Sequence, residues 1–503
     1  MKPTPVLSAA FGAAISYYGR GPGGDSGLPW LLGFMVVCGI LLSLTQVLAA
    51  APAWFFTEPR CHRLCREMRV YSIALAMGFS LGLAAGAPHP VRLGLPVEKI
   101  SGLYGALQDD PRGFNDGRGM GYLGLQGVMG AGGLRASAAG KILVFFPAGA
   151  IPRLKEFGRA SEVYIEGAFL APGISEKKTD ASGNQARAFR AGSVHITLPA
   201  PGLEQFRTSL RMNLVERLAT PAWGGLALAL LLGVRDTLDT DLAEAYRKAG
   251  CSHVLALSGL HLAMVSSMIA FFLRKPLGLQ LAAMMGALFI IGYIYLVGDL
   301  PSLHRAAIMY LLGTLAVMGA LPRQPASLLG MSFLIQIVVQ RESGHTISCI
   351  LSYLALGGIL FIGEALHDLI RGKIPEVLAQ GLAASLGAFI ATVAVVSWCF
   401  GMVRPVGIIA GLLIVPLTTL FMAGAMAVLA LDVLAPCLAG PVGMILSLLY
   451  DGLEQMVSLA ALVPGISIPG MVLVLTASLG VSILIMFLRM RQTVLRSNLV
   501  PFN

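Results

Sequence analysis

Histidine, serine and arginine side chains gather in a part of the sequence that is otherwise apolar. The stretch Tyr246–Val265 carries His253, Ser258, Gly259 and His261 directly after an amphipathic, charged segment. On one continuous helix the two histidines would lie within about 80° of each other, two turns apart. An ionisable residue in a membrane helix is by default a candidate for function. The alternative is a pair of neutral imidazoles that hydrogen-bond to neighbouring helices, and the sequence leaves both interpretations open.

A second group of polar residues follows about forty positions later. Asp299 can cap the start of a helix, Pro301 suits its first turn, and Ser302, His304 and Arg305 come next. Arg305 is either an anchor at the membrane interface or a cation inside the protein that faces a polyanion. Its position beside His304 and Asp299 weakens the preference for an anchor.

These residues belong to a chain whose composition is that of a membrane protein. Of its 503 residues, 56% are hydrophobic and only 12% are charged. An ordinary globular domain carries roughly 25% charged residues, so a water-facing surface of this size could not be covered. The net charge of +10 is explained by basic cytoplasmic loops and their attraction to anionic lipid. The alternative explanation is that the protein transports a polyanion.

The distribution of charge and glycine divides the chain into five parts. Four arginines between positions 60 and 69 indicate a cytoplasmic loop, so the segment after the next apolar run is expected outside the cytoplasm. Alternating runs at Val97–Tyr104, Lys141–Phe146, Val163–Phe169 and Ser193–Leu198 predict strands, separated by glycine-rich turns at Asp116–Gly121 and Gly127–Gly140. We expect N-terminal membrane helices in 1–90, a small all-β, OB-like extracytoplasmic domain in 91–200, an amphipathic interfacial helix in 201–222, a helical membrane bundle in 223–490 and a cytoplasmic tail in 491–503.

Interruptions in the apolar helices suggest that the bundle encloses a cavity or path. Trp223–Val234 is too short to cross a bilayer, and Val442–Val463 carries two acidic residues, which favours an interfacial or pore-side helix. Irregular backbone at membrane depth is tolerated only where protein or a water-filled cavity surrounds it. Simple alternation of the helices across the membrane does not place all basic loops on the cytoplasmic side. A re-entrant half-helix at Trp223–Val234 or near His253 would resolve this conflict.

The stretch Leu226–Met309 resembles the ComEC competence-protein family. Its segments are similar to the motifs LLLG-R/D (Leu231–Asp236), H-L-L-A-x-S-G-L-H (Ser252–His261) and P-S-x-x-R-A-x-x-M (Pro301–Met309); Leu351–Ala355 and Gly407–Pro416 resemble two weaker ones. Gly411 replaces the family's asparagine and Ile350 its glutamine. The H-x-H-x-D-H motif of the family's metallo-β-lactamase-like domain does not occur, so the resemblance is to a short form.

This resemblance implies a multi-pass channel of the bacterial inner (cytoplasmic) membrane. The channel would translocate single-stranded DNA into the cytoplasm during natural transformation, without enzyme activity, cofactor or metal. We expect a translocation path along His253, Ser258, Gly259, His261, Asp299, Ser302, His304 and Arg305, and DNA contacts from Arg247 and Lys248. Tyr104 and Tyr122 would stack on bases as aromatics of OB-type surfaces do; the alternative is that they are core residues.

The expected partners are single-stranded DNA, membrane lipid, a DNA receptor, a separate nuclease, a cytoplasmic ATPase or single-stranded-DNA-binding proteins, and a second copy of the chain. Two other functions remain possible. A small-solute transporter would also explain broken helices and buried histidines, although no inverted repeat is visible. A membrane enzyme would use His253, His261 and Asp299 on a metal.

Overall fold

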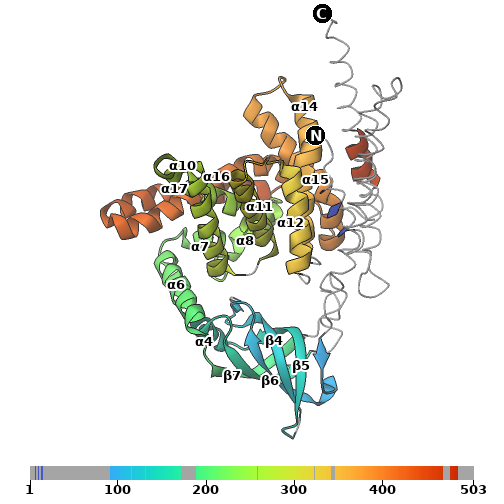
Figure 1. The fold of residues 1–503 in the computed structure, drawn as a ribbon, viewed down its shortest axis with the longest axis vertical. Coiled ribbons are helices and arrows are strands. Elements are labelled where there is room, and N and C mark those ends of the chain that lie inside the picture. The colour runs from blue at the N-terminus through green and yellow to red at the C-terminus, as the bar shows by residue number, and fades with distance from the viewer. Residues whose placement is uncertain are drawn as a thin grey trace, which may run out of the picture.

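The computed structural model of the chain describes residues 91–114, 116–130, 132–170, 188–257, 259–298, 300–321, 323–340, 346–467 and 476–484, with isolated residues 6, 9, 10, 13 and 14. The predicted N-terminal membrane helices, apart from those five residues, and the predicted tail lie outside the described residues. The described part consists of a β-barrel, a connecting helix and a bundle of helices (Figure 1).

Five strands close the barrel on themselves. They pair in the order β5-β7-β6-β2-β4, and β4 pairs again with β5. The β5–β7 pairing is parallel and the others are antiparallel. The elements are β1 (Arg92–Leu93), η2 (Val97–Lys99), β2 (Ile100–Leu107), β3 (Arg112–Gly113), β4 (Gly119–Gly130), β5 (Arg135–Phe146), α4 (Ala150–Phe157), β6 (Glu162–Phe169) and β7 (Ala188–Leu198). The predicted small, OB-like β-domain is therefore confirmed.

The barrel core follows from alternation along the strands. Leu103, Leu123, Ile142, Val163 and their neighbours are buried inside, because every second side chain of a strand points to the same face. The prediction of a long turn at Gly127–Gly140 is wrong. β4 continues to Gly130, and β5 already starts at Arg135. Gly127 leaves room for the Tyr104 side chain of β2, whereas Gly132 and Gly133 (φ 86° and 82°) belong to the short turn itself.

Helix α6 (Gly202–Ala219) joins the barrel to the bundle. Its leucine and phenylalanine side chains at Leu203, Phe206 and Leu210 are exposed, whereas Arg207 is buried. These three side chains are thus accessible on the surface of the helix, and its position at the membrane interface stays a prediction. Arg207 and Arg211, in contrast, contact other parts of the protein.

The bundle contains long and very short helices. They are α7 (Gly224–Leu232), α8 (Thr240–Lys248), α9 (Ser252–Leu255), α10 (Gly259–Val297), α11 (Pro301–Met318), α12 (Pro325–Val339), α13 (Ile347–Gly358), the π-helical η4 (Ile359–Gly363), α14 (Glu364–Ile370), α15 (Glu376–Phe400), α16 (Val406–Leu434) and α17 (Pro436–Ala461). Within the described residues, five helices are long and apolar enough to cross a bilayer: Leu273–Val297, Ile347–Ile370, Glu376–Phe400, Val406–Leu434 and Pro436–Ala461. The predicted multi-pass helical fold is confirmed.

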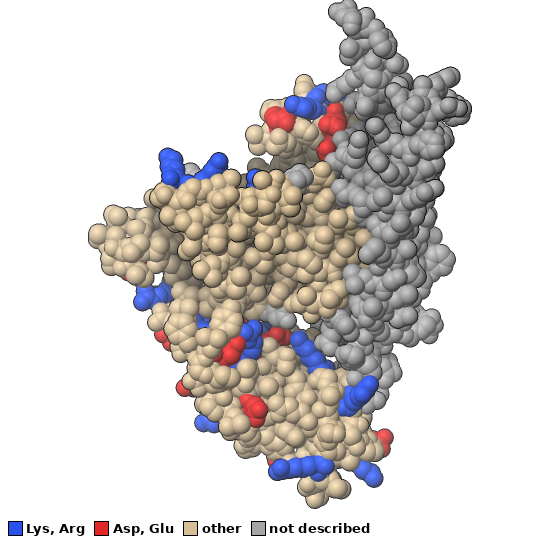
Figure 2. Space-filling view, viewed as in Figure 1, with Lys and Arg blue, Asp and Glu red and all other residues tan. Residues whose placement is uncertain are grey.

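Charged side chains are distributed along the molecule in a membrane-like pattern. On the face drawn in Figure 2 they gather over the barrel at one end and over α10 and α14 at the other, with a nearly uncharged band between. The turn in α10 at Gly278 (φ 77°) divides it into two helical halves. In the view of Figure 1, α17 runs at a steep angle to α12 and α15.

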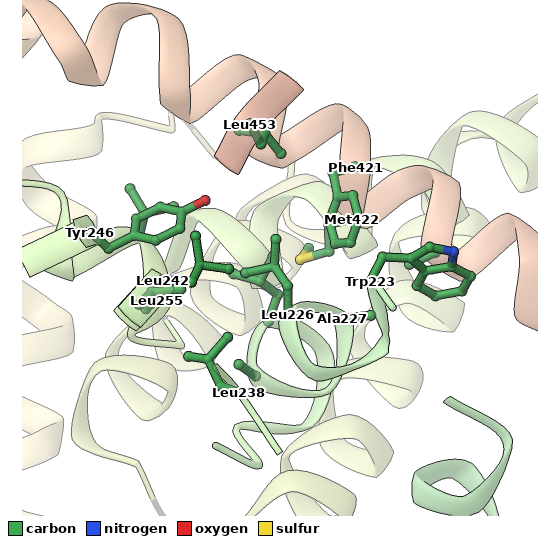
Figure 3. Close-up of a cluster of buried hydrophobic side chains, with 14 of the residues drawn as sticks. Trp223, Leu226, Ala227, Leu238, Leu242, Tyr246, Leu255, Phe421, Met422 and Leu453 are labelled. Atoms are coloured by element: carbon green, nitrogen blue, oxygen red, sulfur yellow. The ribbon is translucent and has the colours of Figure 1, made fainter. Parts of the chain in front are cut away.

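The centre of the bundle is built around α7. Every residue from Leu226 to Leu232 is buried, and these residues pack against α8, α16 and α17 (Figure 3). At 1.5 Å per residue the helix is about 14 Å long, against roughly 30 Å of hydrocarbon. It ends at Gly233 in a left-handed conformation (φ 69°), and the chain turns back into α8. A short helix that turns back in this way is compatible with the predicted re-entrant half-helix at Trp223–Val234, which stays a prediction.

Glycine sets the distance between two of the long helices. A Cβ on Gly358 of α13 would come within 2.3 Å of the Gly387 carbonyl oxygen of α15, whereas a Cβ on the adjacent Gly357 would meet nothing within 4 Å. We expect Gly358→Ala to lower the free energy of unfolding by about 1–3 kcal/mol, because α13 and α15 must separate. Gly357→Ala is the matched control, and thermal unfolding in lipid nanodiscs compares the two. Equal midpoints would contradict the close crossing.

Candidate functional site at a helix break

The stretch that carries both histidines is two helices rather than one. α9 ends at Leu255, Ala256 is extended (φ −76°, ψ 125°), and α10 begins at Gly259. The exposed His253 precedes this break and the buried His261 follows it. The predicted placement of both histidines on one helix is therefore wrong, because the chain leaves the helical conformation between them. Ser258 lies outside the described residues.

Side chains of two other motifs stabilise the break. Arg235 donates from Nη2 to the Leu255 carbonyl oxygen at 2.9 Å. Ser302 donates from Oγ to the Leu257 carbonyl oxygen at 2.8 Å. A broken helix leaves such carbonyls without their intrahelical partners, so these two hydrogen bonds replace what the break removes.

Arg305 lies beside the break and is 8% exposed. A Cβ on Gly259 would come within 3.0 Å of its Nη2, so the glycine is what lets the guanidinium approach the start of α10. The buried Nε of Arg305 has no hydrogen-bond partner among the described residues. A buried cationic donor without a partner among the described residues is costly, which marks Arg305 as a candidate binding group.

Tyr353, from the motif Leu351–Ala355, contacts Arg305 beside the helix break. Its ring centroid is 5.7 Å from the Arg305 guanidinium carbon. Its hydroxyl donates to Gln336 Oε1 at 2.8 Å, and Gln336 Nε2 donates to the Pro301 carbonyl oxygen at 3.1 Å. The chain of contacts therefore runs from α13 through α12 to the start of α11. Sequence reasoning missed Gln336 and did not assign a role to Tyr353, although the motif Leu351–Ala355 contains it.

The remaining predicted residues lie at or near the first turn of α11 or on α8. Leu300, and not Asp299, is the N-cap residue of α11, and Asp299 lies outside the described residues. His304 Nδ1 lies 3.1 Å from the Leu300 carbonyl oxygen. Arg247 and Lys248 lie on α8, where both pair with Glu244 at 3.3 and 3.1 Å.

The two tyrosines predicted to bind DNA lie on the outer surface of the barrel. Tyr104 is on β2 and is 38% exposed. Tyr122 is on β4, with Lys141 Nζ 4.4 Å from its ring centroid. Register places Tyr104 opposite Gly127, five residues along β4 from Tyr122, so the two rings occupy separate patches.

Two arginines of α6 join the barrel to the bundle. Arg207 is 1% exposed and holds Asp110 of the barrel through Nη1 at 3.1 Å and Nη2 at 2.5 Å, while its Nε donates to the Tyr295 carbonyl oxygen at 2.7 Å. Arg211 donates to the carbonyls of Leu296, Val297 and Leu232 at 3.2 Å each. These carbonyls end α10 and α7, where the helix dipole favours a cation.

The charge at this junction is nearly balanced. Burial acts to raise the pKa of Asp110, but the hydrogen bond from Arg207 and the charges of Arg211, Arg207 and Arg159 outweigh it, so the pKa lies below its usual range. Arg159 also pairs with Glu204 at 2.7 Å. Asp110 is thus held as a carboxylate between the arginines.

A metal centre receives no support from the described residues, none of which form a group of three or more histidine, cysteine, aspartate or glutamate side chains placed to hold a metal ion. The arrangement that the structure does assemble is a buried guanidinium, the π-face of Tyr353 and a helix break whose carbonyls accept hydrogen bonds from Arg235 and Ser302.

Comparison with known proteins matches the same region. Residues 230–493 match the family model described as Competence protein. "ComE operon protein 3" of Bacillus subtilis (strain 168) is 27% identical over 192 residues, which cover 36% of this chain and 24% of the relative. The chain thus spans about a quarter of that relative's length. No solved structure gives a significant match.

Proposed function

The chain belongs to the Competence protein family, and because it does, we propose that it conducts single-stranded DNA across the bacterial cytoplasmic membrane during DNA uptake. The observation that carries this proposal is the buried Arg305 beside the helix break. Each phosphate of the strand brings one negative charge, and a dry apolar path would exclude it.

The surroundings of Arg305 suit a ligand that must leave again. The Arg305 guanidinium, whose Nε has no partner among the described residues, offers a phosphate a charge-assisted hydrogen bond. Conduction requires binding that is favourable but weak. In the described part of the chain the Arg305 guanidinium lies over the Tyr353 ring, and one cation of this kind meets that requirement better than a basic cluster would.

The orientation is proposed from the distribution of basic residues. Arg323, Arg371 and Lys373 lie exposed in turns that join the bundle helices, and Arg274 and Lys275 lie exposed on α10 shortly before its kink at Gly278. Basic residues favour the cytoplasmic side, so the barrel would face the other side. In intact spheroplasts, a membrane-impermeant maleimide should label a cysteine placed at Ser101 in the barrel and not one placed at Lys373. Labelling at Lys373 alone would reverse the orientation.

Gly259 provides the functional test. Gly259→Leu would displace the Arg305 guanidinium, because even a Cβ there comes within 3.0 Å of it. In cells that carry the chain as their only copy, we expect transformation by exogenous DNA to fall on the order of tenfold or more.

The matched control is Gly292→Leu on the same helix, where a Cβ meets nothing within 4 Å. It should transform at the wild-type level with equal membrane abundance. Wild-type transformation in Gly259→Leu cells would remove the break from the proposed path.

A further inference from the structure

Three aromatic side chains form a row across the outside of the barrel. Strand register sets Tyr104 of β2 opposite Tyr164 of β6, and Tyr164 opposite His195 of β7. The rings of Tyr164 and His195 are stacked, with centroids 6.4 Å apart and an angle of 24° between their planes. We call Tyr104, Tyr164 and His195 the aromatic row.

Two glycines let the tyrosine rings of this row lie against the barrel wall. A Cβ on Gly127 would come within 2.2 Å of Tyr104 Cε1, and a Cβ on Gly102 would come within 2.7 Å of Tyr164 Oη. Each ring therefore occupies the space that a neighbouring side chain would fill. Covering a glycine in this way stabilises a sheet by itself, but it accounts for neither the third ring nor the charges beside the row.

Two carboxylates flank the aromatic row. Glu162 and Glu166 lie two positions before and after Tyr164 on β6 and so share its face. Ser193 donates to Glu166 at 2.9 Å. Burial and the negative charge of Glu166 raise the pKa of Tyr164, and the nearby Arg135 opposes this change. The row thus combines aromatic faces with carboxylate acceptors, and the negative charges of Glu162 and Glu166 beside it disfavour a polyanion.

We propose that the aromatic row binds a neutral oligosaccharide. The apolar C–H face of a sugar ring packs on a flat aromatic ring, and sugar hydroxyls donate to carboxylates such as those of Glu162 and Glu166. Adjacent strands are about 4.8 Å apart, so three strands present a row about 10 Å long, enough for two sugar rings. OB-type barrels bind oligosaccharides as well as oligonucleotides. This site is separate from Arg305 and does not depend on DNA conduction.

The test uses the full chain in phosphatidylcholine nanodiscs, which contain no sugar headgroups. The probes are chitohexaose, cellohexaose and maltohexaose, with a twenty-residue oligothymidylate for comparison, and titration calorimetry measures binding. We expect saturable binding of at least one glycan, weakened tenfold or more by Tyr104→Ala. Phe114→Ala, which removes a barrel aromatic that is 43% exposed and lies outside the row, should leave the affinity unchanged.

Two further variants keep the result decisive if Tyr104→Ala disturbs the barrel. His195→Ala leaves both glycines covered and should also weaken the glycan at least tenfold. Glu166→Gln should weaken it several-fold, since a charge-assisted hydrogen bond becomes a neutral one. Failure of all three glycans to bind, or binding that none of these variants affects, would overturn the proposal. So would oligothymidylate binding that Tyr104→Ala weakens and Glu166→Gln strengthens.

Discussion

Arg305→Gln is expected to reduce transformation by about 100-fold, the effect of removing the charged partner from a desolvated contact with a phosphate. The same substitution should leave the thermal midpoint of the purified chain unchanged or raised. The reason is that Arg305 is a buried cation whose Nε has no partner among the described residues, and such a charge costs stability.

Transformation efficiency and thermal unfolding in nanodiscs check this pair of results together. Arg323→Gln is the control, because it removes one positive charge from the exposed α11–α12 connection without touching the break. It should transform like the wild type. A large loss of stability in Arg305→Gln would mean instead that Arg305 is a structural residue whose partner is part of the fold.

Arg207→Ala is expected to produce the largest loss of stability, about 3–5 kcal/mol, because it leaves the partly buried Asp110 carboxylate without its main partner. It also removes the hydrogen bond to the end of α10. The exposed pair of Arg217 and Asp432 supplies the control. Arg217→Ala should cost less than about 1 kcal/mol.

The pH dependence of the thermal midpoint provides a second test of the Arg207–Asp110 pair. Because the pKa of Asp110 is depressed, its stabilising effect is complete above its unfolded pKa of about 3.9 and is lost as pH falls through the lower, folded value. Asp110→Asn should therefore flatten the acid-side slope of the thermal midpoint, as should Arg207→Ala. If Arg207→Ala and Arg217→Ala behave alike, the junction does not hold the barrel on the bundle.

Much of the architecture could be predicted because it rests on periodicity. The strand at Val163–Phe169 was predicted from apolar alternation and is β6 with one more residue. By contrast, β5 starts six residues before the predicted Lys141, since alanine, serine and glycine carry no hydrophobic alternation. The glycines at the end of β4 resembled a turn but serve close packing, as Gly127 does beneath Tyr104.

The candidate site was predictable in its parts and not in its assembly. Ser302 and Arg305 were recognised by residue type and motif, and the structure sets both beside the break. The break itself was missed because Ala256 and Leu257 are good helix formers, whereas the break is stabilised by tertiary hydrogen bonds from Arg235 and Ser302 to the carbonyls of Leu255 and Leu257. Gln336 gave no signal, since one glutamine in an apolar helix has many ordinary explanations.

The most direct test of conduction is passage of DNA through the purified chain in a planar lipid bilayer. A single-stranded oligonucleotide is added on the barrel side, a voltage positive on the opposite side is applied, and the DNA that arrives there is amplified and counted. The account predicts passage through the wild-type chain, accompanied by transient block of the ionic current, and strongly reduced passage through Arg305→Gln. Ionic current with no DNA crossing in the wild type, or equal crossing in both chains, would contradict it.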